Sequence, residues 1–62
     1  MRELVKRGFT QENGVDMFYV ELSCDSSETK PTTGIIDGSV AIESNTGKGF
    51  LFNEKSGDWV EV

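Results

Sequence analysis

Side chains that could carry chemistry are few in this chain. It has no histidine and a single cysteine, Cys24. Nucleophilic catalysis needs a nucleophile beside a base, commonly histidine, and a structural zinc site needs about four cysteine or histidine ligands. Asp25 follows Cys24 and does not supply the positive surroundings that activate a thiol. We therefore predict a buried or inert thiol, no metal site and no histidine-based mechanism.

Carboxylates are the remaining candidates, because paired carboxyl groups can act as general acid and base. They show no signature spacing and fall in turns or on outward strand positions: Glu12, Asp16, Glu21, Asp37, Glu43, Glu54, Asp58 and Glu61. We interpret them as solvated surface. The sequence thus predicts no catalytic residue, no cofactor, no small-molecule substrate and no enzymatic activity.

Two short polar motifs resemble ligand loops without matching them. The segment 45–49 has a Gly-Lys pair but lacks the spacing of a phosphate loop, and no helix follows it. The segment 25–28 lacks the alternating acidic pattern of a calcium loop. We expect the first to be a turn and the second to be part of a polar loop.

The charge of the chain argues against a nucleic-acid partner. Eleven acidic and six basic residues give a net charge of −5, the wrong sign for holding a phosphate backbone. Residues 1–8 carry charges where a signal peptide would be apolar, and no stretch approaches a membrane span. We expect no export by a signal peptide and no membrane partner.

An Asn13-Gly14 pair separates two extended-looking runs, residues 4–10 and 15–23. Both residues tolerate the positive φ angles of a type I′ turn, so the pair predicts a β-hairpin over residues 1–23.

Alternation along the second run of this hairpin divides its side chains between two faces. Phe18, Val20 and Leu22 share one face, which we predict to be the core. Met17 and Tyr19 lie on the opposite face and also need cover, which favours a second layer or a partner.

Residues 24–38 are rich in Ser, Thr, Asp and Gly and contain the only proline, Pro31. We predict a connecting loop, because Pro31 comes too soon after a capping pattern at residues 25–28 for a useful helix. We expect one residue of its apolar pair, Ile35 or Ile36, to anchor the loop.

Residues 39–62 predict a three-stranded meander, with strands at 39–43, 49–53 and 58–62 and turns between them. The period of two places Phe50 and Phe52 on one face and directs Leu51 and Trp59 the other way. Both faces are again partly apolar.

The whole chain therefore predicts a single all-β domain, residues 1–62, with a small antiparallel sheet of about five strands. A chain of 62 residues buries only roughly 60% of its unfolded surface, so its stability is marginal without help. Because disulfides and zinc are excluded, we expect a barrel-like or sandwich arrangement completed by oligomerisation. The candidate protein-interaction residues are Met17, Tyr19, Leu51 and Trp59.

Several motifs after Pro31 carry a family resemblance: Gly38-Ser39 opening a strand, a Thr46-Gly47 turn, an aromatic strand at 50–52, an acidic turn at 53–54, and Trp59. This half of the chain resembles small virion-associated proteins of tailed phages and prophages of Gram-positive bacteria. The resemblance implies a structural accessory of the head or tail, found in the virion or the bacterial host cytoplasm. The alternative is a small acidic inhibitor that binds a basic site on a host protein.

Overall fold

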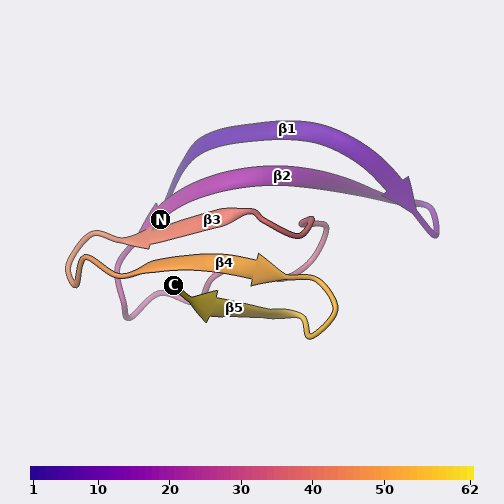
Figure 1. Cartoon of the computed structure of the whole chain (residues 1–62). Helices are drawn as coiled ribbons and strands as arrows, with labels where there is room; N and C mark the ends of the chain where they lie inside the picture. The colour runs from indigo at the N-terminus through magenta and orange to yellow at the C-terminus, as the bar shows by residue number, and fades with distance from the viewer.

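Five strands and no helix make up the fold of the computed structural model, which describes all residues 1–62. Asparagine, glycine and serine turns divide the chain into β-branched and aromatic runs, which favour strands. The strands form one sheet in sequence order (Figure 1). Their bounds are β1 (Arg2–Glu12), β2 (Val15–Cys24), β3 (Val40–Glu43), β4 (Gly49–Asn53) and β5 (Asp58–Glu61). The predicted all-β class with about five strands is confirmed.

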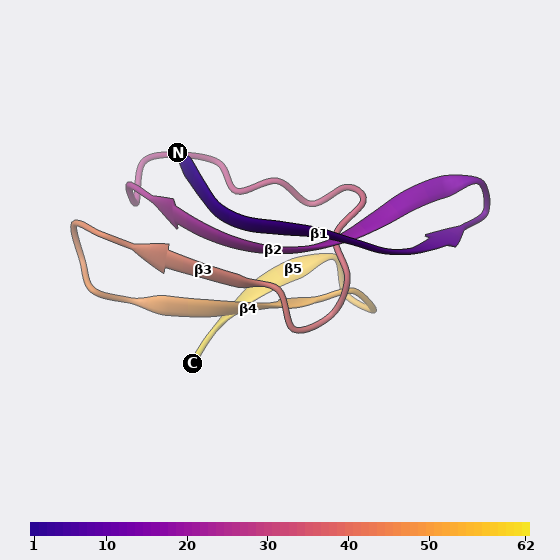
Figure 2. The ribbon, with the colours of Figure 1, turned by 90° about the horizontal axis from the view of Figure 1, so that it is seen from above.

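The sheet is mixed, which corrects the prediction of an antiparallel sheet. β2 and β3 pair in parallel, with Glu21 opposite Val40, whereas the other three pairings are antiparallel. Parallel neighbours need a crossover of a dozen residues or more, which the segment Asp25–Ser39 supplies. It crosses one side of the sheet (Figure 2). The sheet is open and not closed into a barrel, so one sheet with one covering loop stands in place of the barrel-like or sandwich arrangement that we expected.

The hairpin turn has the predicted chemistry. Asn13 and Gly14 both have positive φ angles, 53° and 79°, as a type I′ turn requires. The turn sets the register that places Val15 opposite Glu12. The hairpin prediction is confirmed, and β2 runs one residue further, to Cys24.

The face of the sheet under the crossover, which we call the covered face, holds the core. Its buried cluster consists of Val20, Leu22, Ile35, Ala41 and Phe52. The predicted core face of β2 is confirmed, and Ile35 is the predicted anchor of the loop. Ile35 forms a parallel bridge with Phe18, so part of the loop continues the sheet where β3 has not yet begun.

Two polar contacts fasten the crossover to the covered face. The indole N–H of Trp59 donates to the carbonyl oxygen of Pro31 at 2.8 Å. The Lys30 ammonium lies 2.9 Å from a carboxylate oxygen of Glu43 and 4.3 Å from the ring centre of Phe50. The middle of the loop, at Lys30 and Pro31, is therefore held to β3 and β5 by polar contacts as well as by packing.

Ser39 ends the crossover at a fully buried position. Its hydroxyl oxygen accepts the backbone N–H of Val20 at 3.1 Å, a donor that the β2–β3 ladder does not reach. Its own carbonyl accepts the N–H of Phe52. A small hydroxyl side chain is thus required where the loop becomes β3.

The polar segment after β2 forms a turn. The Asp25 carboxylate accepts the N–H of Ser27, and the Glu28 carboxylate accepts the N–H of Asp25. The Glu28 bond to Asp25 is one half of a capping box, whereas the Asp25 carboxylate accepts from Ser27 instead of Glu28, and no helix follows. Cys24, just before it, is buried as predicted, with its thiol 3.7 Å from the carbonyl of Ile42.

β1 forms one edge of the sheet. Its pairing with β2 shifts at Leu4 and again at Phe9, where an extra residue bulges from the ladder. Bulges and charged residues interrupt an edge that would otherwise accept another strand, and β1 has both. Edge pairing is therefore disfavoured along most of β1.

Candidate protein-interaction surface

The outer face, opposite the crossover, has no chain segment packed over it (Figure 2). Register places its side chains in two rows that cross all five strands. The Leu51 row contains Val5, Glu21, Val40, Leu51 and Val60. The Gly49 row contains Arg2, Ser23, Ile42, Gly49 and Val62, the last joined to Gly49 by a backbone hydrogen bond. Backbone pairing between strands therefore fixes where the side chains of the outer face lie.

Apolar side chains occupy the β3–β5 half of these rows. Ile42, Leu51 and Val60 are 42–49% exposed and Val62 is 77% exposed. With the half-buried Val40 they form what we call the outer apolar patch: Val40, Ile42, Leu51, Val60 and Val62. Contiguous exposed apolar patches on soluble proteins commonly mark interaction sites.

The four predicted interaction residues do not lie on one surface in the structure. Leu51 lies at the middle strand of the outer apolar patch. Tyr19 is half-buried on the same face of the sheet, where its hydroxyl donates to Glu21 at 2.7 Å. That hydrogen bond, with burial and the Glu21 charge, raises the pKa of Tyr19. Met17 lies near the hairpin turn and is buried, with 8% of its surface exposed, so little of its side chain is available to a partner.

Trp59 lies on the covered face, and the prediction that it points with Leu51 is wrong. Antiparallel register places Trp59 opposite Phe52, and directly paired residues share a face. The two rings pack with centroids 5.1 Å apart at an interplanar angle of 58°. Alternation within one strand does not define its alignment with the next, so the error arose in the register.

Sequence reasoning missed Ile42, Val60 and Val62 as candidate surface residues. Their alternation with Ala41 and Glu61 was visible, but which set faced the core was not. No signal in the sequence identified them, because the pairing of Leu51 with Val40 and Val60 is defined only by the register of the folded sheet.

A second feature of the outer surface lies beside the hairpin. A shallow hollow of about 310 Å³ is lined by Arg7, Gly8, Phe9, Tyr19 and Ile36. Phe9 is 69% exposed because the bulge turns it out of the ladder. This hollow extends the apolar character of the outer surface past Tyr19.

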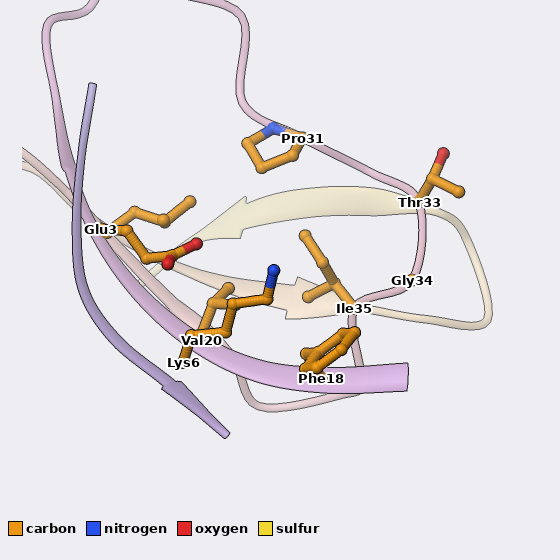
Figure 3. Close-up of a pocket in the computed structure, with 9 residues that line it drawn as sticks. Glu3, Lys6, Phe18, Val20, Pro31, Thr33, Gly34 and Ile35 are labelled. Atoms are coloured by element: carbon orange, nitrogen blue, oxygen red, sulfur yellow. The ribbon is translucent and has the colours of Figure 1, made fainter. Parts of the chain in front are cut away.

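A smaller cavity of about 120 Å³ lies under the crossover, between β1, β2 and the loop (Figure 3). Lys6 reaches over the ring of Phe18, with 4.5 Å from its ammonium to the ring centre. Pro31, Thr33 and Ile35 form the opposite wall (Figure 3). Ligand sites usually measure about 300 Å³ or more, so this space reflects loose packing of the loop.

Three carboxylates meet where the hairpin approaches the β4–β5 turn. The pKa of Glu12 is raised by a hydrogen bond to Glu54 and repulsion from it, then by burial and by Asp37. Asp37 also accepts the backbone N–H of Glu54. No group of three or more acidic, cysteine or histidine side chains has an arrangement that could hold a metal ion.

Helices long and apolar enough to cross a membrane are absent from the structure. No protein-family model, curated protein or solved structure matches the chain.

Proposed function

We propose that this protein is a non-enzymatic structural accessory that acts by self-assembly or by docking on a larger protein assembly. The uncovered outer apolar patch is the observation that carries this proposal. The crossover covers one face of the sheet, and no other segment of residues 1–62 covers the opposite face. Exposed β-branched and leucine side chains gain free energy when another protein removes them from water.

The setting we propose is the particle of a tailed phage or prophage, in the virion or in the host cytoplasm during assembly. The resemblance of the motifs from Gly38 to Trp59 to those of small virion-associated proteins supports this setting. Ser39 and Trp59 of this pattern hold the loop to the sheet, so the motifs describe how the fold is built. A structural accessory needs such a scaffold and a surface, and no reacting group.

Charge distribution supports docking through the patch over docking through acidic groups. The side chains of the outer apolar patch carry no charge, and the nearest acidic side chain on β2, Glu21, is engaged by Tyr19. Acidic residues are otherwise distributed over turns and strand ends, such as Glu12, Glu54 and Asp58. A partner that covers the patch is therefore recognised mainly by shape and apolar area.

Light scattering across a size-exclusion peak tests the proposal, from low micromolar to several hundred micromolar protein. We expect the molar mass to rise with concentration above the 6.9 kDa of one chain. Leu51→Lys should keep the protein monomeric, whereas Thr32→Lys, which adds the same charge on the exposed loop, should not. The fold of both variants is checked by circular dichroism.

Mass spectrometry of purified phage particles from the host tests the setting. Recovery of the wild-type chain in particles and its loss for Leu51→Lys would support the accessory role. A chain that stays monomeric at every concentration and is absent from particles would refute the proposal.

A further inference from the structure

The two rows of the outer face are complementary to each other, and we propose that a second copy of this chain stacks face to face on the outer apolar patch. The two-fold axis crosses the strands between the Leu51 row and the Gly49 row. This inference rests on the proposed function and specifies its partner and geometry. Stacked sheets lie about 10 Å apart with their strands aligned, which allows this arrangement.

The position of the two-fold axis follows from the sizes of two residues of β4, Leu51 and Gly49. Because the axis passes between the rows, Leu51 of one copy lies over Gly49 of the other, and the reverse. Leu51, one of the two largest side chains of the patch, then faces the position that has none, as interdigitating layers require. The side chain of Val62 lies 3.4 Å from the point that a Cβ atom on Gly49 would occupy, and it forms one wall of that space.

The flanking strands continue the match. The same axis places Val40 over Ile42 of the second copy on β3, and Val60 over Val62 on β5. Each apolar side chain of the patch therefore faces another apolar side chain or Gly49. All five strands of one copy overlap those of the other.

Charge is also matched at the β1–β2 end. Glu21 in the Leu51 row faces Ser23 of the second copy, whose direct neighbour across the ladder is Arg2. Symmetry gives two Glu21–Arg2 contacts, one on each side. A two-fold axis along the strands over β4 leaves β1 and β2 beyond the edge of the second copy, with Glu21 unpaired.

The contact area indicates how tightly the two copies should associate. The outer apolar patch exposes on the order of 400 Å² per copy, a size typical of functional patches on small proteins. The β1 and β2 members of the two rows extend the contact toward about 800 Å² per partner, the usual size of a specific interface. We expect a dimer that dissociates on dilution into the micromolar range.

A charge-rescue experiment tests the geometry by sedimentation velocity. Val40→Lys and Ile42→Asp should each weaken self-association at least about tenfold, because each places a charge against an apolar side chain. Mixed in equal amounts, the two variants should form a heterodimer, since the new ammonium at position 40 of one faces the new carboxylate at position 42 of the other. The remaining Ile42 and Val40 of that pair keep their native contact.

A second mixture, Val40→Lys with Val60→Asp, is the matched control. Under the proposed axis these positions do not face each other and no heterodimer should form. Rescue in the control mixture alone would overturn the proposed geometry and leave self-assembly intact. Wild-type protein that remains monomeric throughout would overturn the proposed dimer, and its absence from phage particles as well would overturn the proposed function.

Discussion

The two faces of the sheet differ in what covers them. On the covered face, the crossover places Ile35 against Val20 and Phe52, and it is held by Trp59 and by the Lys30–Glu43 pair. On the outer face, Leu51 and Val60 are as regularly placed but remain about half exposed. Residues 1–62 supply one covering segment for a sheet with two apolar faces.

The shape of the molecule agrees with this division. Its shortest dimension is 16 Å, which accommodates the sheet and the single loop that covers it. Stability of the single chain should therefore depend on the covered face, and association should depend on the outer face.

The largest difference in stability is expected between substitutions at two adjacent residues of β4, Phe52 and Leu51. Phe52→Ala removes a buried ring from the core and should cost about 3–5 kcal/mol. A domain of this size has only about 3–9 kcal/mol in total, so this variant should lose a large part of its stability. Leu51→Ala on the outer face should cost less than about 1 kcal/mol in the monomer. Urea denaturation at low protein concentration measures both, and equal costs would remove the distinction between the faces.

The attachment of the crossover to the covered face depends on Ser39. Ser39→Ala leaves the Val20 N–H buried without an acceptor, which should cost about 1–3 kcal/mol. Ser56, whose hydroxyl donates to Asn53 in an exposed turn, is the control, and its alanine variant should change little. A cost at Ser39 no larger than at Ser56 would show that the loop closes without this bond.

A smaller effect is expected where the loop meets β5. Trp59→Phe keeps an aromatic ring against Phe52 but removes the N–H bond to Pro31, at a cost of about 0.5–1.5 kcal/mol. Amide hydrogen exchange should accelerate at residues 32–36 while the β1–β2 ladder is unchanged. Unchanged exchange in the loop would indicate that packing alone holds it.

The pH dependence of stability tests the Lys30–Glu43 contact. Hydrogen bonds from Lys30 and then Thr46 lower the pKa of Glu43 from its ordinary value of 4.5. A carboxyl group with a lowered folded pKa stabilises fully above its unfolded value, and this contribution is lost as pH falls through the folded pKa. Glu43→Gln should therefore lose less stability than wild type on acidification below pH 4.5.

Other carboxylates affect the same titration. The pKa of Glu28 is lowered by the N-terminal amine and then by the Asp25 N–H, and that of Asp25 by the backbone and then the hydroxyl of Ser27. Glu12 acts in the opposite sense, because its pKa is raised and its ionisation above pH 4.5 opposes folding. Thermal melts of Glu43→Gln and Glu12→Gln should therefore change the pH slope in opposite directions. Parallel slopes would contradict the assignment.

Local signals in the sequence predicted local structure well. The Asn13-Gly14 turn and the strand at 49–53 lie where they were expected, because turn chemistry and alternation act over a few residues. The role of Ile35 followed from its place in the only apolar pair of a polar loop.

Longer-range features could not be predicted in the same way. The parallel pairing of β2 with β3 depends on the path of a loop whose residues specify no direction. The face of Trp59 depends on its pairing with Phe52, and one step of register reverses every side chain in a strand. The outer apolar patch was therefore only partly predicted, with Leu51 identified and its neighbours on β3 and β5 missed.

Backbone amide chemical shifts, recorded by NMR on serial dilution, test the central claim most directly. Mass action makes any self-association concentration-dependent. We expect the amides of Val40, Ile42, Leu51 and Val60 to shift on dilution, while those of residues 32–35 in the loop stay constant. Shifts confined to the loop, or none at any concentration, would contradict the assignment of the outer face as the surface that a second copy covers.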